Sequence, residues 1–369
     1  MKKFTISQTI ALDTQAKALQ RAGHDVINLS VGELDFPVPP PIQEAVAIAV
    51  SAHSNRYSAV AGLPEARQAA VDYEFKQHQV HYQPEQVLVS NGAKQALATA
   101  FLALLEPGDE VLILQPAWVS YVEQIKLAGG VPVSVETTDQ FQPDVAAIQS
   151  VITKRTVGII LNYPNNPTGA VYGRTVLQQI ADLAQQQHWW VVSDEIYEHI
   201  IYDGTEFLSF ASLYPNTITV NGLSKANAVT GWRIGYAAGP KDIITAMTAV
   251  QSHVTGNVSN VMQAALVPGL ATGLSAEWLA ELQQRRQLVV DALHSPPPAG
   301  AFYCFIDIRR FGLDSITFCQ RLLQDYHVAL VPGTYFGRDG FVRLSFANNQ
   351  PNLRTALERL VAFYAILPQ

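Results

Sequence analysis

Residues Asn221 to Gly235, NGLSKANAVTGWRIG, are the most informative part of this chain. Lys225 in this stretch follows a β-rich segment, Thr217–Val220, and Arg233 comes eight positions later. An apolar neighbourhood disfavours the charged form of a lysine, so part of Lys225 is a free amine that can attack a carbonyl. An arginine can bind a phosphate through two parallel hydrogen bonds. The pair therefore suits a ligand with an aldehyde at one end and a phosphate at the other, although any single lysine can also be an exposed residue on a turn.

Size and composition describe an ordinary globular protein. The chain has 369 residues, which exceeds the size at which one core keeps growing, so we expect two domains. A net charge of -7 argues against nucleic acid as a partner. We find no signal-peptide core and no apolar run that could span a bilayer, so we expect a cytoplasmic protein with no membrane partner. Cys304 and Cys319 match no metal or redox spacing, and no metal is expected.

Strand-like and helix-like segments alternate through the middle of the chain, which predicts an α/β fold with a mostly parallel sheet covered on both faces. Such sheets bind ligands beyond the carboxyl ends of their strands, where Lys94, Asn166, Asp194 and Lys225 fall. The expected strands are Gln86–Ser90, Val111–Gln115, Val131–Glu136, Val157–Asn162, Trp190–Asp194 and Ile218–Asn221. The expected helices between them include Ala93–Leu105, Arg174–Gln187 and Ile243–Val250.

A second, smaller α/β domain is expected after this region. The long amphipathic stretch Ser275–Leu293 leads to a proline break at Pro296–Pro298. Short β-like segments and a final helix follow it, at Ala301–Asp307, Val328–Val331, Phe341–Phe346 and Pro351–Tyr364. We therefore expect residues 39–274 to form a large cofactor-binding domain, and residues 1–38 with 275–369 to form the small domain.

Three motifs near the expected strand ends carry chemistry. The turn Asn162–Gly169, NYPNNPTG, follows a buried-looking strand. Asp194 ends the next strand, where a carboxylate is costly unless it meets a positive charge; the alternative is a helix N-cap. The run Gly92–Lys94 opens a helix, whose free N–H groups and dipole favour a phosphate.

Together these motifs resemble the class I aminotransferases of the PLP-transferase fold type I, from about Ile27 to Phe363. The likeness is greatest to the bacterial subgroup that contains aspartate aminotransferases. It implies pyridoxal 5'-phosphate (PLP) as cofactor, a large domain with a mostly parallel, seven-stranded type of sheet, a smaller α/β domain, and a homodimer with shared active sites.

The resemblance also implies a role for each candidate residue. Lys225, Asp194 and Tyr197 match the catalytic residues: the lysine that bonds the cofactor and moves the proton, the carboxylate on the pyridine nitrogen, and a donor to the phenolate oxygen. The remaining cofactor contacts would be Gly92, Ala93, Lys94, Ser224 and Arg233 around the phosphate, Tyr57 from the neighbouring subunit, Trp118 stacked on the ring, and Asn166 on the phenolate. The substrate contacts would be Arg343, which binds the α-carboxylate, with Gly32, Trp118 and Asn166.

Several of these residues keep an ordinary structural alternative. Trp118 can be a core residue, Tyr57 a surface residue on a turn, and Arg343 a residue of a half-buried strand that points to solvent. The chain also departs from the family pattern. Leu34 stands where a proline is usual, the chain begins short, and the connection from Leu293 to Ala301 is shorter than usual.

The expected function is transfer of an amino group from an L-amino acid, aspartate or another acidic donor, to a 2-oxo acid such as 2-oxoglutarate. Lys94 could serve the cofactor phosphate or a second substrate carboxylate; in the first case Tyr335 and Phe336 become the candidate specificity residues. The alternatives are an aromatic, broad-specificity or alanine-type aminotransferase, and a carbon-sulfur lyase or aminocyclopropane-carboxylate synthase on the same fold. A transcription regulator would need a basic DNA-binding domain, and a nucleotide-binding protein would need a glycine-rich fingerprint that we do not find.

Overall fold

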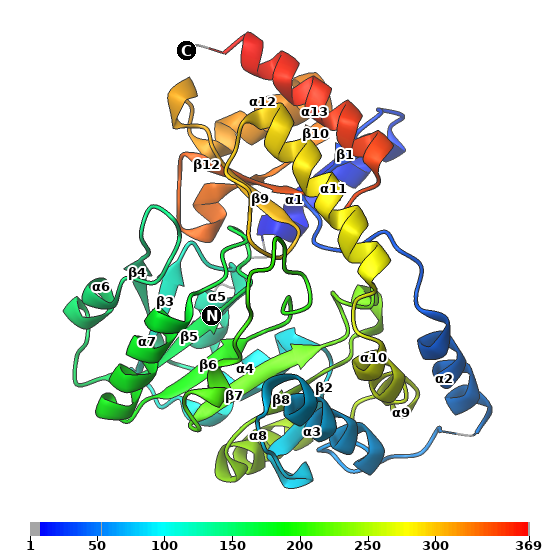
Figure 1. Cartoon of the computed structure of the whole chain (residues 1–369), viewed down its shortest axis with the longest axis vertical. Coiled ribbons are helices and arrows are strands. Elements are labelled where there is room, and N and C mark those ends of the chain that lie inside the picture. The colour runs from blue at the N-terminus through cyan, green and yellow to red at the C-terminus, as the bar shows by residue number, and fades with distance from the viewer. Residues whose placement is uncertain (1–7, 53, 368–369) are drawn as a thin grey trace.

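The main feature of the fold is a seven-stranded sheet (Figure 1), seen in a computed structural model that describes residues 8–52 and 54–367. All of its strands run parallel except β8, which is antiparallel to both of its neighbours. The strand order is β2 (Val87–Ser90), β8 (Gly235–Ala238), β7 (Thr217–Gly222), β6 (Trp190–Asp194), β5 (Thr156–Asn162), β3 (Glu110–Gln115) and β4 (Val131–Glu136). The mostly parallel sheet expected from the sequence is confirmed.

Helices cover both faces of this sheet, because its central strands are apolar on both sides. Successive residues of one strand point to opposite faces. Val111 and Ile113 pack with α4 (Ala93–Leu104), α5 (Ser120–Leu127) and α8 (Lys241–Val254). Leu112 and Leu114 pack with α6 (Val145–Ser150) and α7 (Arg174–Gln187) on the other face. Over β2 and β8, that second face is covered by α2 (Pro40–Ser51), α3 (Pro64–His78) and α10 (Leu266–Thr272). The short α9 (Asn260–Gln263) lies next to α2.

The rest of the chain forms a second layered unit above the carboxyl ends of the large sheet. Its three-stranded antiparallel sheet has the order β11 (Val331–Pro332), β12 (Phe341–Ser345) and β9 (Tyr303–Asp307). A two-stranded parallel sheet joins β1 (Ile27–Asn28) to β10 (Val328–Ala329). The helices of this unit are α1 (Gln8–Arg21), α11 (Ala276–Leu293), α12 (Ser315–Tyr326) and α13 (Gln350–Ala365).

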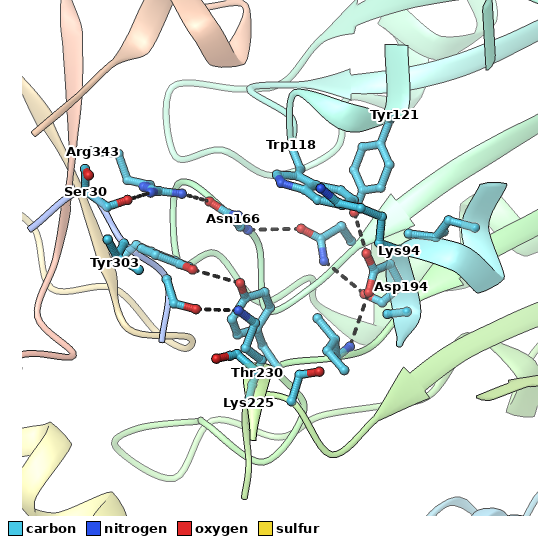
Figure 2. A pocket seen from close by; sticks show the side chains of 18 of the residues that line it. Ser30, Lys94, Trp118, Tyr121, Asn166, Asp194, Lys225, Thr230, Tyr303 and Arg343 are labelled. Atoms are coloured by element: carbon cyan, nitrogen blue, oxygen red, sulfur yellow. Dashed lines mark hydrogen bonds between the residues drawn. The ribbon is translucent and has the colours of Figure 1, made fainter. Parts of the chain in front are cut away.

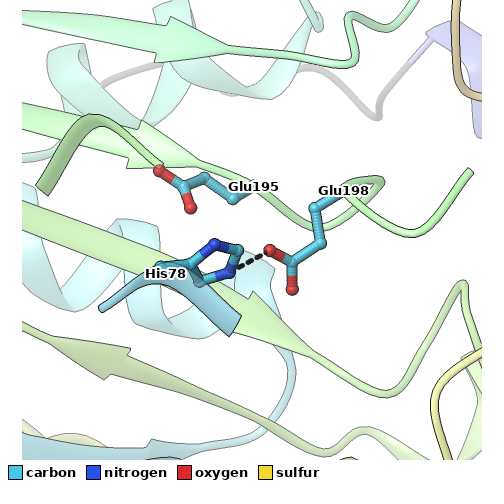
Figure 3. Close-up of side chains that lie close together, drawn as sticks. All are labelled: His78, Glu195 and Glu198. Carbon is cyan, nitrogen blue, oxygen red and sulfur yellow. Dashed lines mark ion pairs between the residues drawn. The ribbon is translucent and has the colours of Figure 1, made fainter. Parts of the chain in front are cut away.

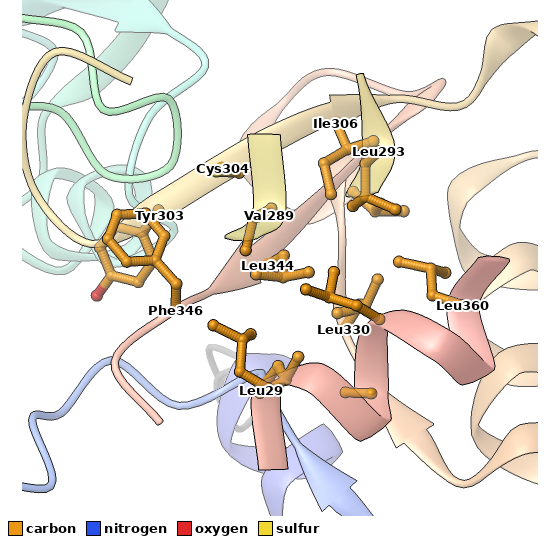
Figure 4. Packing of buried hydrophobic residues seen from close by; sticks show 14 of the residues in the cluster. Leu29, Val289, Leu293, Tyr303, Cys304, Ile306, Leu330, Leu344, Phe346 and Leu360 are labelled. Carbon is orange, nitrogen blue, oxygen red and sulfur yellow. The ribbon is translucent and has the colours of Figure 1, made fainter. Parts of the chain in front are cut away.

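One hydrophobic cluster holds this second unit together. Figure 4 shows Leu29, Val289, Leu344 and Leu360 converging on it from four separate parts of the chain. Leu34, the residue that replaces the usual proline, is 7% exposed and belongs to this cluster. Tyr197 belongs to it as well, so the core reaches the segment that follows β6.

The structure corrects two expectations. The segment Val328–Val331 is not one strand, because β10 and β11 pair with different partners on either side of Leu330. The strand β8 was missed, because Gly235–Ala238 reads GYAA and has no β-branched residue. The short connection before Ala301 contains no strand; Gly300 only forms a bridge with Ile201.

Five 3₁₀ turns complete the described part of the chain: Pro84–Gln86, Phe210–Ser212, Thr230–Trp232, Arg309–Phe311 and Gly333–Phe336. Among the residues described, no helix is both long enough and apolar enough to cross a membrane.

Candidate active site

A cavity of about 470 Å³ lies where the carboxyl ends of the parallel strands face the second unit. It brings together most of the residues that the sequence singled out (Figure 2). Those that line it are Gly32, Ala93, Lys94, Trp118, Asn166, Asp194, Tyr197, Ser224, Lys225, Arg233 and Arg343. Gly92 lies just behind this lining, and Tyr57 is elsewhere on the surface.

Lys225 projects into the cavity three residues after β7. Its Nζ donates a hydrogen bond to the backbone oxygen of Gly32 and lies 5.6 Å from the ring centroid of Tyr197. Burial, helped by the positive charge of Arg343, lowers the pKa of Lys225 to about 8. A larger fraction of this amine is therefore uncharged at neutral pH than for an ordinary lysine, as nucleophilic attack on a carbonyl requires.

Asp194 is the last residue of β6, and its carboxylate is buried at the base of the cavity. Tyr121 donates a 2.7 Å hydrogen bond to its Oδ2, and the backbone N–H of Ile196 approaches its Oδ1 at 3.4 Å. Burial raises the pKa of Asp194 to about 6, although the Tyr121 hydrogen bond opposes this shift. Among the described residues no cationic side chain forms an ion pair with Asp194, and no helix begins there, so the N-cap alternative is wrong.

Tyr197 and Tyr303 form a pair on the side of the cavity next to Lys225. Their hydroxyl oxygens are 2.8 Å apart and hydrogen-bonded, and their rings meet edge to face. Tyr303 also limits residue 32 to glycine, because a Cβ there would lie 2.1 Å from the tyrosine Oη. Burial raises the pKa of Tyr197 well above its usual value, so its hydroxyl keeps its proton and can donate it in a hydrogen bond.

Arg343 on β12 faces inward, so the alternative of a solvent-facing arginine is wrong. The residue is 4% exposed. Its Nη1 donates a 2.9 Å hydrogen bond to Oδ1 of Asn166, and its Nη2 donates to the backbone oxygen of Ser30. Its Nε has no partner among the described residues, and none of their carboxylates forms an ion pair with it. A buried guanidinium without an anion is costly, which makes Arg343 a ready site for a carboxylate.

The opposite end of the cavity is formed by the first turn of α4 and by Arg233. Gly92 precedes the helix with φ of 77°, and a Cβ on it would lie 2.8 Å from Nη2 of Arg233. The N–H groups at the start of an α-helix have no partner within the helix, so Ala93 and Lys94 present free donors here. With the hydroxyl of Ser224 these groups form a corner whose donors can bind an anion.

Lys94 and Trp118 lie together on the same wall. The Nζ of Lys94 is 4.9 Å from the centre of the Trp118 ring. Burial, together with the charge of Arg233, lowers the pKa of Lys94. Trp118 is partly exposed and lines the cavity, so it is not an ordinary core residue.

Several lining residues were missed in the sequence, among them Tyr121, Tyr303 and Ser30. Tyr303 is the first residue of β9, and its position near the start of an expected strand was the one available signal. Tyr335 and Phe336 do not line the cavity, although the Phe336 ring lies 5.1 Å from the guanidinium of Arg343.

This set of side chains fits PLP. The cavity pairs a buried amine of lowered pKa with a buried carboxylate that forms no ion pair within the described part of the chain, and it ends in a corner of N–H donors where a Cβ at Gly92 would press against Arg233. An aldehyde, a pyridinium nitrogen and a phosphate complement these three features. The fold and the site therefore define a PLP-dependent enzyme of fold type I.

Comparison with known proteins narrows this class. The family model "Aminotransferase class I and II" matches residues 24–360. An aspartate/prephenate aminotransferase from Thermus thermophilus is 41% identical over 365 residues, covering 96% of this chain and 94% of the relative. An aspartate aminotransferase from Thermotoga maritima is 38% identical over 372 residues, covering 98% of each chain. A solved structure of the T. thermophilus aspartate aminotransferase with maleate has a TM-score of 0.94 at 40% identity, covering 98% of this chain and 100% of that one.

The chain belongs to the class I and II aminotransferases. The family uses PLP to transfer an amino group between an amino acid and a 2-oxo acid, so the chain is a PLP-dependent transaminase.

Proposed function

We propose that this transaminase prefers acidic amino donors, aspartate first, and that it passes the amino group to 2-oxoglutarate. The observation that carries the proposal is the position of two cations in one cavity, Arg343 on β12 and Lys94 on α4. A dicarboxylic amino acid needs one positive group for each carboxylate. Both relatives described above carry aspartate in their names, and maleate, a dicarboxylate, is bound in the solved T. thermophilus structure.

We assign Arg343 to the α-carboxylate and Lys94 to the side-chain carboxylate of the substrate. Arg343 is held in place by Asn166 and Ser30, so its guanidinium is oriented before a substrate arrives. Lys94 lies against Trp118 and has a flexible stem, so it can reach either the cofactor phosphate or a substrate group. Asp13, the acidic residue of α1 that lines the cavity, is paired with Lys17 at 2.8 Å rather than with either of these cations.

The proposed proton transfer depends on Lys225. Bound PLP supplies an aldehyde that bonds amines and a ring that delocalises the electron pair left on the substrate α-carbon. Lys225 would hold the cofactor through its aldehyde, and Nζ of Lys225 as a free amine would accept the proton of the substrate α-carbon and deliver it to the C4' carbon. The pKa of about 8 lets this nitrogen both accept and release a proton near neutral pH.

The remaining residues are assigned to hold the cofactor and to polarise its ring. We assign the Asp194 carboxylate to the ring nitrogen, where it keeps a proton in place, with Tyr121 fixing its orientation. Tyr197 and Asn166 are assigned as donors to the phenolate oxygen. Gly92, Ser224, Arg233 and the backbone N–H groups of Ala93 and Lys94 are assigned to the phosphate. Trp118 is assigned to the face of the ring, and Gly32 to the substrate.

Three further features remain predictions. Tyr57 is 97% exposed and does not line the cavity of its own chain, which supports a homodimer in which it reaches the neighbouring cofactor phosphate. We also propose the division into residues 39–274 and residues 1–38 with 275–369 as two domains, with residues 1–7, 53 and 368–369 outside the described part. The separate cores of the sheet and of the second unit support it. The cytoplasmic location stays a prediction from the sequence.

A donor panel tests the substrate proposal. The values of kcat/KM for aspartate, glutamate, alanine and phenylalanine are measured with 2-oxoglutarate and then with pyruvate as acceptor. The proposal requires aspartate to exceed alanine and phenylalanine by about tenfold or more, the size expected for one additional charge-assisted contact. A preference for neutral or aromatic donors overturns it and leaves the transaminase assignment intact.

A further inference from the structure

A second cluster of chemically active side chains lies behind the cofactor cavity. His78, Glu195 and Glu198 each place one nitrogen or oxygen ligand atom within 4.8 Å of those of the other two (Figure 3). His78 is the last residue of α3, whereas Glu195 and Glu198 lie in the turn directly after β6. None of the three lines the cofactor cavity.

In each of the two carboxylates, Oε1 accepts hydrogen bonds from the surrounding protein and Oε2 remains for a ligand. Oε1 of Glu195 accepts hydrogen bonds from Ser193 Oγ at 2.7 Å, from Ser209 Oγ at 3.1 Å and from the Phe210 N–H at 3.1 Å. Its Oε2 has no hydrogen-bond partner among the described residues, although Glu195 is fully buried. This arrangement orients one oxygen of Glu195 toward the cluster.

Glu198 repeats the pattern. Its Oε1 accepts from Tyr73 Oη and from Asn221 Nδ2, and its Oε2 lies 2.7 Å from Nε2 of His78. Outer hydrogen bonds of this kind fix the orientation of the carboxylates that ligate metal ions. Imidazole nitrogen and carboxylate oxygen are ligands that zinc and cobalt ions bind well.

The charge of the cluster also calls for a cation. Glu74, one helical turn before His78, is fully buried too and accepts a 2.7 Å hydrogen bond from Tyr236. Two imidazoles lie close to Glu198, that of His78 at 2.7 Å and that of His199 at 3.9 Å, and no lysine or arginine of the described residues forms an ion pair with these carboxylates.

We infer that His78, Glu195 and Glu198 form a binding site for a divalent transition-metal ion, such as Zn²⁺ or Co²⁺. The ion would replace the proton shared between His78 and Glu198, and binding would release it to solvent. The ligand atoms of a tetrahedral zinc ion with bonds of about 2.1 Å lie about 3.4 Å apart, so His78 and Glu198, which are 2.7 Å apart, must separate and the widest pair must close. His78 ends a helix and can make that adjustment.

Such an ion would join α3 to the turn that carries the cofactor residues. Glu195 directly follows Asp194, and Glu198 directly follows Tyr197. The ion would therefore fix the backbone on which both of these side chains stand. It would touch neither substrate nor cofactor, so the three ligands are positioning residues.

Cobalt binding to the holoenzyme tests the inference directly. We expect the metal-stripped holoenzyme to take up one equivalent of Co²⁺ with visible d–d absorption, and to melt a few degrees higher when the ion is in excess. Release of a proton on binding, followed in weakly buffered solution, is expected as well. Absence of stoichiometric uptake means that His78 and Glu198 form only an ion pair, and overturns the inference.

Matched variants separate this site from other metal binding. Glu195→Gln keeps the Oε1 acceptor and removes the charge, and His78→Gln keeps a donor toward Glu198, so both are expected to fold. Each should weaken Co²⁺ binding by at least about tenfold. His253→Ala, which removes an exposed histidine of α8, should bind as the wild type does. If all four proteins bind Co²⁺ equally, for example because the cofactor itself chelates the ion, the inference is overturned.

Discussion

The Oη atom of Tyr121 donates a 2.7 Å hydrogen bond to Oδ2 of Asp194, which links α5 to the carboxyl end of β6. This bond stabilises the charged form of a carboxylate whose burial raises its pKa to about 6. Since only the charged form can balance a protonated ring nitrogen, the pair connects cofactor binding to pH.

Tyr121→Phe should therefore move the pH dependence of PLP binding. The affinity of the apoenzyme is expected to fall as the pH is lowered through the pKa of Asp194, because the protonated carboxyl loses its charge. A hydrogen bond to a charged group contributes about 1.5–3 kcal/mol, or roughly 1–2 units of pKa. The midpoint of the fall should thus move to higher pH by about that amount in the variant.

The measurement is the PLP dissociation constant across a pH series that brackets the wild-type midpoint. Tyr214→Phe is the matched control, since it removes another buried hydroxyl, one that donates 2.6 Å to the backbone oxygen of Trp189. An unchanged midpoint in Tyr121→Phe would show that the bond does not control Asp194.

Lys225 should be the residue that carries the cofactor. Its pKa of about 8 leaves about a tenth of the amine uncharged at pH 7, far more than for an ordinary lysine. Borohydride reduction of the holoenzyme should fix PLP to the peptide that contains Lys225. Attachment to the apoenzyme should become faster as the pH rises and level off above the pKa.

The variants Lys225→Arg and Lys241→Ala complete this experiment. Arginine keeps the positive charge but cannot attach the cofactor, so label and turnover should both be lost. Lys241 is an exposed residue of α8, and its removal should change neither. A reduced adduct on any other lysine would contradict the assignment.

The sequence predicts the parts of the site that local chemistry defines. Asp194, Lys225 and the turn around Asn166 each follow an apolar strand, and the carboxyl ends of parallel strands meet at one edge of a sheet. Their convergence in one cavity could therefore be predicted from the sequence alone.

The remaining parts depend on pairs of residues that are far apart in the chain. Tyr121 meets Asp194 across 73 positions, and Tyr197 meets Tyr303 across 106 positions. Neither tyrosine partner stands in a motif of its own, so periodicity and turn signals give no reason to select it. The cluster of His78 with Glu195 and Glu198 was missed for the same reason, since an α3 residue meets the turn after β6 only in the folded chain.

Tyr57→Phe should weaken cofactor retention if Tyr57 crosses to a neighbouring subunit. The side chain is 97% exposed in a single chain, so its hydroxyl is free to reach a partner. Loss of one hydrogen bond to a phosphate should cost about 1–3 kcal/mol in PLP binding. The dissociation constant is measured together with sedimentation at the assay concentration. Tyr326→Phe on α12 serves as the control, and a fully active monomer would rule out the shared site.

Arg343→Ala should raise KM for every amino donor by a similar factor. The α-carboxylate is common to all of them, and loss of a charge-assisted contact costs about 1.5–3 kcal/mol, or roughly ten- to a hundredfold. Arg343→Lys should be intermediate, because an ammonium keeps the charge but not the two parallel donors. Arg354→Ala, on the exposed face of α13, should leave KM unchanged. An effect limited to one donor would place Arg343 on the side chain of the substrate.

Lys94→Ala should separate the two roles open to Lys94. If its ammonium meets the side-chain carboxylate of an acidic donor, the variant should lose about ten- to a hundredfold in kcat/KM for aspartate, corresponding to about 1.5–3 kcal/mol. Alanine and phenylalanine lack that carboxylate and should be spared, so they act as controls within the same protein. If Lys94 serves only the phosphate, all donors should decline together and PLP should bind more weakly. The ratio of aspartate to alanine kcat/KM, measured in saturating PLP, therefore decides whether Lys94 selects the substrate or only holds the cofactor.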